Sequence, residues 1–229
     1  MIITIDGPAG TGKSTVARKV AERLGFDFLD TGAMYRAVAL EALRRGVDLS
    51  DARELGFVAR HCRIAFDWGQ RPPGVLLNGE LVSHLLRGSE VTSAASHVAA
   101  VPAVRQRLVH EQQRIAAEHG NLVTEGRDQG TVVFPSAQLK IYLDAASTER
   151  ARRRIAQLRA QGETAHLDAV LKEILERDQR DSRRSVGPLT VPPGAKVIDT
   201  TNLTTDQVVE QIVKLARTAL AAPAGDVAV

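Results

Sequence analysis

The sequence predicts an α/β protein in which a parallel sheet is covered by helices on both faces. Five short apolar runs are expected to form strands, at 2–6, 26–30, 121–126, 139–144 and 196–200. Most of these runs are too continuously apolar to be half-exposed hairpins, so they are expected to form buried parallel strands. Helical patterns separate the runs, and this alternation of strand and helix is typical of such a sheet.

The elements follow one another with clear boundaries. The first apolar run leads into the glycine-rich turn "GPAGTGKST" at 7–15, and an amphipathic helical pattern follows until Gly25. A glycine at that place is a common helix end. The second run ends in "DTGAMYR" at 30–36, which opens another helix. Later helices are expected over 103–120, 148–162, 167–184 and 205–220.

The interval from about 36 to 100 interrupts this rhythm. It holds the β-like pieces "RIAFDW" at 63–68 and "GVLLNGELV" at 74–82, with "GQRPPG" and "NGE" turns around them. We therefore expect a small β-containing insertion over 36–100 between the second and third core strands. Such insertions at the carboxyl ends of strands usually serve a ligand site. The tail 221–229, "AAPAGDVAV", is expected to be disordered.

The composition limits the binding partners and the cellular compartment that we expect for this protein. The formal net charge is +3 and aromatic residues make up 3% of the chain, so platforms for stacking nucleic-acid bases are few and no nucleic-acid partner is expected. The single cysteine, Cys62, excludes an intrachain disulfide and favours a reducing compartment. No basic leader precedes the first strand, and no apolar run approaches the roughly 18 residues of a membrane span. We expect a cytoplasmic protein without a membrane contact.

The turn at 7–15 matches the P-loop pattern of a glycine, four residues, then Gly-Lys-Ser, between a strand and a helix. Glycines let backbone N–H groups wrap a phosphate, and the helix directs its positive end at the anion. Lysine would reach the β- and γ-phosphates of a triphosphate, and Ser14 can bind Mg²⁺. The predicted ATP-binding residues are Gly7, Pro8, Ala9, Gly10, Thr11, Gly12, Lys13, Ser14 and Thr15.

A P-loop alone does not name the reaction, because GTPases, motor ATPases and small-molecule kinases share it. No guanine motif of the Asn-Lys-x-Asp type is present, and the length excludes a large ATPase. Glu125 ends the third predicted strand, where it is either a metal ligand acting through water or an exposed acid.

Three further clusters each allow a structural and a functional interpretation. Asp30 or Thr31 can cap a helix, and Arg36, one turn later, can also clamp a second phosphate. Arg127 and Asp128 form either a local ion pair or a phosphate contact beside a base or sugar contact. The last cluster places arginine, aspartate and arginine on one helix face, either as a solvated ladder of ion pairs or as part of a site; its members are Arg177, Asp181 and Arg184.

Taken together, these motifs resemble the bacterial cytidylate kinases. The resemblance runs in order from residue 2 to about residue 220 through "GPAGTGKST", "LDTGAMYRA", "SEVTSAASHVAAVPAVRQ", "EGRDQGTVVFP", "ERARRR" and "ERDQRDSRR" followed by "SVGPL". It implies a nucleoside monophosphate kinase fold with sheet order 2-3-1-4-5. The P-loop core would span 1–35 and 101–220, the CMP-binding insertion 36–100, and a short lid 150–168.

The resemblance also implies roles for single residues. Ser96, Arg105 and Asp128 would meet cytosine, Arg177 and Asp181 would meet the ribose, and Thr31 would line the same pocket. Arg36, Arg127 and Arg184 would bind the acceptor phosphate, and the arginines at 152–154, Arg153 among them, would begin the lid helix and close over the transferred group. Three features depart from the family pattern. Gln129 stands where an apolar residue is expected, Gly187 stands where alanine is expected, and "TVPPGAK" at 190–196, a loop expected near the adenine, is unusual before the last strand.

The expected reaction is ATP + CMP or dCMP → ADP + CDP or dCDP, with Mg²⁺ as cofactor and with Lys13, Arg127, Arg153 and Arg184 as catalytic residues. Two alternatives stay open at this point. One is a kinase for UMP or AMP, and the other is a nucleotide-binding regulator or nucleic-acid-binding module without turnover. We expect the protein to act as a monomer.

Overall fold

The computed structural model describes residues 1–160 and 162–221, so the predicted tail lies outside the described residues from 222 onward. Five strands form the main sheet: β1 (Ile2–Asp6), β2 (Asp27–Asp30), β6 (Leu122–Gly126), β7 (Leu139–Asp144) and β8 (Lys196–Asp199). Their order is β2-β6-β1-β7-β8, and every pairing between them is parallel. The predicted fold class and the predicted order 2-3-1-4-5 of the core strands are therefore confirmed.

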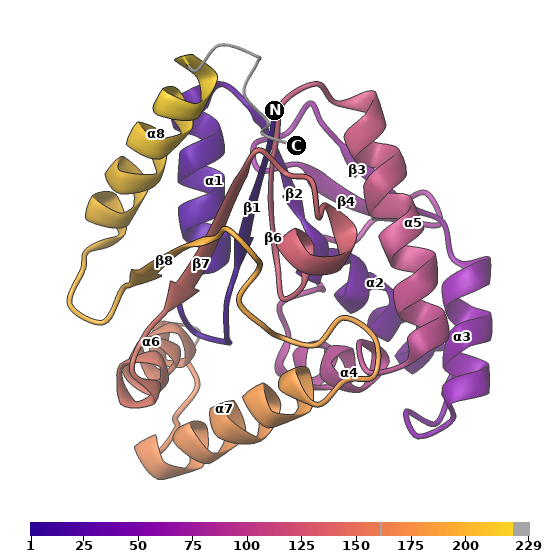
Figure 1. The fold of residues 1–229 in the computed structure, drawn as a ribbon. Helices are drawn as coiled ribbons and strands as arrows, with labels where there is room; N and C mark the ends of the chain where they lie inside the picture. Colours follow the sequence, from indigo (N-terminus) through magenta and orange to yellow (C-terminus); the bar gives the residue numbers. More distant parts are fainter. Residues whose placement is uncertain (161, 222–229) are drawn as a thin grey trace.

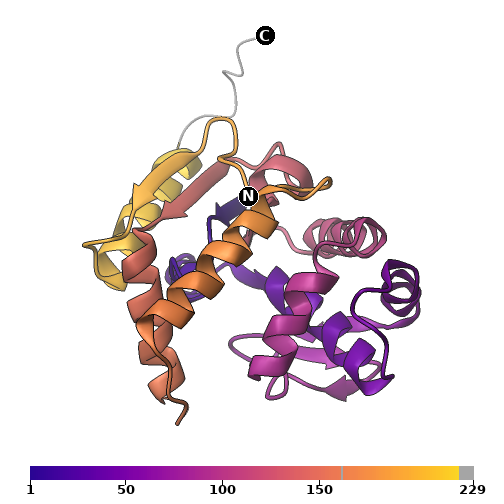
Figure 2. The same ribbon diagram turned by 90° about the horizontal axis from the view of Figure 1, so that it is seen from below.

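Helices cover both faces of this sheet, as Figures 1 and 2 show. One face packs against α1 (Lys13–Leu24) and α8 (Thr205–Ala221), with Val16, Val20 and Ile212 in its core. A second core lies among α2 (Thr31–Arg44), α3 (Ala52–His61), α4 (Ser89–Val98) and α5 (Pro102–Glu118). Strands buried on both sides explain why the apolar runs show so little alternation.

The region predicted as a β-containing insertion holds a three-stranded antiparallel sheet, β3 (Ile64–Asp67), β4 (Gly74–Leu77) and β5 (Glu80–Leu81), in that order. It also holds α3 and α4, which the sequence analysis did not predict. Helix α3 is capped by Asp51, whose carboxylate accepts hydrogen bonds from the amides of Arg53 and Glu54. Helix α4 begins after Gly88 without a side-chain cap, so it lacked the usual signal of a helix start.

Two helices lie beyond the carboxyl end of β7, at the bottom of Figure 1. Helix α6 (Ser147–Ala160) begins before the arginines at 152–154, so the prediction that these arginines open the lid helix is wrong. Helix α7 (Leu167–Ser182) ends before Arg184, so Arg184 does not share a helix face with Arg177 and Asp181 as predicted. Within the described ranges, no helix combines the length and the apolar character that crossing a membrane requires.

The register of the sheet brings several chain segments to one edge. Asp6 of β1 is the partner of Gly126 on one side and of Tyr142 on the other, and Asp30 of β2 is the partner of Glu125. The P-loop, the "DTGAMYR" turn and the "GRDQGT" turn therefore leave the sheet side by side, as expected for a ligand site at the carboxyl ends of parallel strands.

Candidate active site

The P-loop follows β1 and bends tightly over the neighbouring strand. Gly7 has φ 146°, and a Cβ at this position would lie 2.1 Å from the carbonyl oxygen of Leu143, so only glycine fits this approach. The loop feeds directly into α1, whose first residue is Lys13. A glycine-rich loop that leads straight into the N-terminus of a helix offers backbone N–H groups and the positive end of the helix to a phosphate.

Lys13 is folded back onto the loop itself. Its Nζ donates to the carbonyl oxygen of Pro8 at 2.7 Å, and the residue is 5% exposed. Burial and the nearby Arg127 guanidinium hold the pKa of Lys13 well below its ordinary value, against an opposing effect of Glu125. Because burial disfavours the charged form of Lys13, a bound polyanion would stabilise that form strongly.

A hydroxyl and a carboxylate meet beside the P-loop. Ser14 Oγ donates to Glu125 Oε1 at 2.8 Å, and Glu125 is 4% exposed at the end of β6. Burial and the charge of Asp30 raise the pKa of Glu125. The interpretation of Glu125 as an exposed strand-end acid is therefore wrong. Hard oxygen donors of this kind suit Mg²⁺, which usually keeps several waters and phosphate oxygens as its other ligands.

Strand β2 ends at Asp30, which caps helix α2 and binds Arg36 of the same helix. Asp30 accepts the amide of Ala33 at 2.8 Å, and Arg36 Nη2 donates to the other oxygen of Asp30 at 2.9 Å. Thr31 is 2% exposed and its hydroxyl donates to the carbonyl oxygen of Glu125 at 2.6 Å. Asp30 is the cap, and Arg36 is held at the same edge as the P-loop.

Asp181 gathers arginines from separate segments. Arg127 Nε donates to one carboxylate oxygen at 2.8 Å, and Arg184 pairs with the other. The side chain of Asp181 is 1% exposed, which rules out a solvated ladder of ion pairs. Arg177 lies one turn earlier on α7 and makes no ion pair with Asp181 within 4 Å among the described residues.

The resulting cluster is strongly cationic. It contains Arg36, Arg127, Arg177 and Arg184 with Asp181 between them. Burial and the charges of Arg127, Arg36 and Arg184 lower the pKa of Arg177 to about 10, although Asp181 acts in the opposite direction. Two carboxylates pair with these four guanidinium groups, Asp30 with Arg36 and Asp181 with Arg127 and Arg184, so the cluster keeps an excess of positive charge. A phosphate dianion would balance that charge and would match the fork geometry of arginine.

A second buried pair lies beside this cluster. Arg105 of α5 pairs with Asp128, and their side chains are 2% and 4% exposed. The guanidinium also donates to the carbonyl oxygen of Ala99 at 3.2 Å, and its Cζ lies 5.5 Å from the centre of the Tyr35 ring. The backbone at Gly187 packs against this pair: it has φ 62°, and a Cβ at this position would lie 2.1 Å from Asp128 Oδ2. This close approach accounts for a glycine where the family pattern has alanine.

Several predicted residues carry buried polar atoms that lack a partner. Seven such atoms are found among the described residues, and five of them belong to residues predicted to bind CMP. These five are Arg36 Nε, Ser96 Oγ, Arg105 Nε, Arg177 Nε and Arg184 Nε. A buried polar group is usually hydrogen-bonded, and leaving it unsatisfied costs about 1–3 kcal/mol. Their concentration in one predicted pocket points to a polar ligand.

Two arginines of α6 differ from expectation. Arg153 donates to Glu149 at 3.1 Å and to the hydroxyl of Thr200 at 3.0 Å, so its partners here are not P-loop residues. Arg150 instead reaches the P-loop, where its Nη1 donates to the carbonyl oxygen of Ala9 at 3.0 Å and also pairs with Asp178. The sequence analysis singled out neither Arg150 nor Asp178 as a site residue.

A buried polar network supports the "GRDQGT" turn and was also missed. Asp6 accepts the amides of Gln129 and Gly130 at 2.8 Å each, which holds the π-helical turn η1 (Gln129–Val133). Burial raises the pKa of Asp6 to about 6. The side-chain amide of Gln129 accepts from Thr124 at 2.8 Å and donates to Gln112 at 3.0 Å. These partners explain how a polar residue occupies an apolar place in the family pattern.

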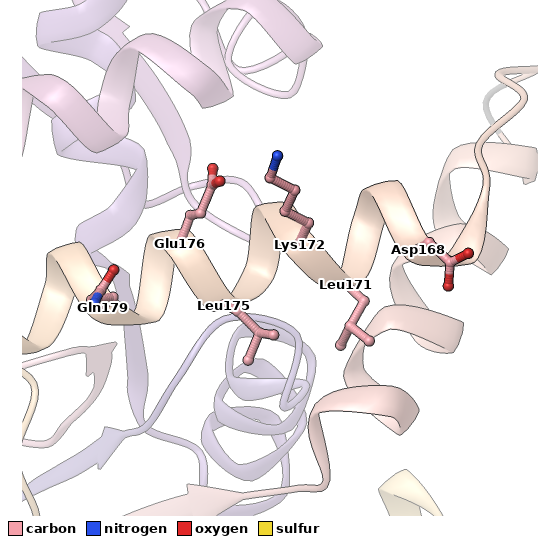
Figure 3. Close-up of a pocket in the computed structure, with 6 residues that line it drawn as sticks. All are labelled: Asp168, Leu171, Lys172, Leu175, Glu176 and Gln179. Atoms are coloured by element: carbon pink, nitrogen blue, oxygen red, sulfur yellow. The ribbon is translucent and has the colours of Figure 1, made fainter.

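A surface hollow runs along α7. Figure 3 shows its six lining residues, all of them from this one helix, with Lys172 and Glu176 on one side and Leu171 and Leu175 on the other. None of the six is a predicted site residue. The predicted residues of the P-loop and of the turns after β2 and β6 instead lie at the carboxyl edge of the sheet.

Known proteins resemble this chain over almost its whole length. The family model described as Cytidylate kinase matches residues 3–218. A cytidylate kinase of Marinomonas sp. is 47% identical over 212 residues, covering 92% of this chain and 93% of the relative. A cytidylate kinase of Vibrio cholerae is 49% identical over 210 residues, covering 92% and 93%. Among solved structures, an uncharacterized protein from Eubacterium ventriosum aligns with TM-score 0.53 and 13% identity, covering 95% of this chain and 98% of that one, which shows a shared fold alone.

Proposed function

Because the chain belongs to the cytidylate kinase family, we propose that it transfers the γ-phosphoryl group of ATP to CMP or dCMP, producing ADP and CDP or dCDP. The observation that carries this proposal is the set of five unpartnered buried polar atoms on Arg36, Ser96, Arg105, Arg177 and Arg184. They lie on α2, α4, α5 and α7 and in the turn after α7, and one nucleoside monophosphate would offer acceptors for all of them.

The donor half of the site would be the P-loop. The backbone from Gly7 to Thr15 would wrap the triphosphate, and Lys13 would leave the carbonyl of Pro8 for the phosphate oxygens. Mg²⁺ would be held by Ser14, with Glu125 acting through water, and it would neutralise charge on the phosphates. The fit rests on the hydroxyl and carboxylate already side by side at this point.

The acceptor half would be divided between two clusters. Arg36, Arg127 and Arg184 would bind the acceptor phosphate, while Arg177 and Asp181 would also meet the ribose. Asp128, Arg105 and Ser96 would bind the cytosine, beside Thr31. Cytosine presents an N4 amino donor next to N3 and O2 acceptors, and this pattern suits a carboxylate beside a guanidinium. The insertion over 36–100 contributes Arg36 and Ser96 to this half.

Catalysis would depend on alignment and charge. A phosphate oxygen is already a nucleophile, so the protein needs no general base. Its residues would bring the two phosphates into line, exclude water and stabilise charge that spreads over the transferred group. Arg153 would join them only after it leaves Glu149 and Thr200, when the lid assigned to 150–168 closes. Residue 161 of that lid lies outside the described part of the chain.

One assay tests the proposal against its alternatives. ADP release is measured with ATP and Mg²⁺ in the presence of CMP, dCMP, UMP, AMP or no acceptor. We expect release that depends on CMP or dCMP and is at least ~10-fold weaker with UMP or AMP. Equal or greater use of UMP or AMP would establish a different monophosphate kinase. No release above the rate without acceptor would establish a binding protein without turnover.

A further inference from the structure

One ion pair joins the P-loop to the helix that carries the acceptor-site residues. Asp178 of α7 accepts the amide of Ala9 through Oδ1 at 3.2 Å, and its Oδ2 pairs with Arg150. The same Arg150 nitrogen donates to the carbonyl oxygen of Ala9 at 3.0 Å. Both polar groups of the Ala9 backbone are thus bound by the two members of one ion pair.

The pair is well enclosed. The side chains of Arg150 and Asp178 are 7% and 18% exposed, and Arg150 Nε also donates to the carbonyl oxygen of Ala145 at 3.0 Å. The P-loop packs directly on this arginine, because a Cβ at Gly10 would come within 3.0 Å of Arg150 Cβ. Three segments meet here: the P-loop, the start of α6 and the C-terminal half of α7.

The position of Asp178 on α7 connects this junction to the arginine cluster. Asp178 directly follows Arg177, and Asp181 comes three residues later on the same helix. Three residues advance a helix by about 4.5 Å. One turn of α7 therefore holds the P-loop through Asp178 and the cations Arg127 and Arg184 through Asp181.

We propose that Asp178 is a positioning residue that couples the donor and acceptor sites by fixing the P-loop to α7. This inference rests on the proposed function. Phosphoryl transfer needs the reacting atoms about 3–3.5 Å apart, and a misplacement of about 1 Å can lower the rate ~100-fold. Asp178 sets that spacing through Ala9 and Arg150, and it touches neither nucleotide.

The charge of Asp178 gives the proposal a distinctive signature. Its carboxylate lies beside the P-loop, where it neutralises Arg150. Removing it leaves an additional cation near the triphosphate, so ATP alone should bind as well as before or more tightly. A residue that contacts a nucleotide would show the opposite, because its loss would weaken binding of that nucleotide by itself.

The test compares the parent protein with Asp178→Ala, Asp178→Asn and the control Glu176→Ala. Glu176 is an exposed acid on the same helix, at the hollow shown in Figure 3. The measurements are kcat and KM for CMP, calorimetric Kd for CMP and for a non-hydrolysable ATP analogue alone, and Kd for CMP in the presence of that analogue. Thermal unfolding reports whether each variant is folded.

We expect Asp178→Ala to lower kcat by at least ~10-fold while each nucleotide alone keeps its Kd within ~3-fold. The tightening of CMP binding by the ATP analogue should disappear. Asp178→Asn should recover part of kcat, because its amide oxygen can still accept from Ala9, and it serves as the reporter if Asp178→Ala does not fold. Glu176→Ala should match the parent.

Three results would overturn the inference: kcat of both Asp178 variants within ~3-fold of the control, single-nucleotide affinities that fall in parallel with kcat, or a parent whose CMP affinity does not respond to the analogue. A parent that does not phosphorylate CMP would overturn the proposed function instead. The two failures are therefore distinguishable.

Discussion

Replacing Asp128 with asparagine tests how the base is recognised. In the parent protein, Asp128 would accept from the N4 amino group of cytosine, while Arg105 donates to N3 or O2. With uracil, Asp128 would face the O4 oxygen, acceptor against acceptor, and Arg105 would face the N3–H donor. An asparagine amide can present a donor to O4, so Asp128→Asn should reduce the preference for CMP over UMP.

The magnitude follows from burial. The side chains of Arg105 and Asp128 are 2% and 4% exposed, so water cannot repair a mismatch. Each mispaired buried polar group costs about 1–3 kcal/mol, which predicts at least a ~10- to 100-fold preference for CMP in the parent. The same substitution weakens a buried ion pair, and removing one member of such a pair altogether costs about 3–5 kcal/mol of stability.

A ratio separates these two effects. The assay measures kcat/KM for CMP and for UMP by ADP release in both proteins, at substrate concentrations below KM. Loss of folded protein lowers both values by one factor and leaves their ratio unchanged, whereas a changed base contact alters the ratio. Equal use of CMP and UMP by the parent, or an unchanged ratio in the variant, would remove Asp128 from base recognition.

Three further predictions concern the phosphate-binding groups. Lys13→Ala should lower kcat by about 100-fold or more, because it removes a cation that stabilises charge in the transition state, and a folded variant with near-normal kcat would contradict the P-loop role. Arg184→Ala should lower kcat/KM for CMP far more than it raises KM for ATP. The loss of thermal stability should be modest, because Asp181 still forms its ion pair with Arg127 in this variant. An unchanged kcat/KM for CMP would show that Arg184 has only a structural role. Burial lowers the pKa of Lys13 and a bound triphosphate would raise it again, so ATP binding should take up a proton, and ATP affinity should fall by up to ~10-fold per pH unit as pH rises from about 7 to about 9. Calorimetry in buffers of different ionisation enthalpy measures this proton uptake, which should vanish in Lys13→Ala. Equal uptake in both proteins would exclude Lys13 as its source.

Local chemistry made much of this molecule predictable. The five strands follow from continuous apolar runs, and the P-loop follows from the spacing of its glycines and lysine, because both signals lie within a few adjacent residues. The insertion was only partly predicted. Its strands are marked by turn residues, while α4 begins after Gly88, which offers no capping side chain to mark the start of a helix.

The unusual residues show the limit of family patterns. Gln129 and Gly187 were visible as departures, but their meaning depends on distant partners. Gln129 is satisfied by Gln112 on α5, and Gly187 lies against the pair of Arg105 and Asp128. Neither contact can be inferred from neighbouring residues, because each joins segments that meet only in the folded chain.

The sequence by itself determined the fold class, the phosphate-binding turn and the family to which the chain belongs, since these depend on residue types at short, fixed spacings. Only the tertiary structure decided which charges pair. Asp181 binds Arg127 from 54 residues away, and Asp178 of α7 binds Ala9 of the P-loop and Arg150 of α6. The physical reason is that α7 ends at Ser182 and crosses the carboxyl edge of the sheet, so the path of that helix selects the partner of each carboxylate.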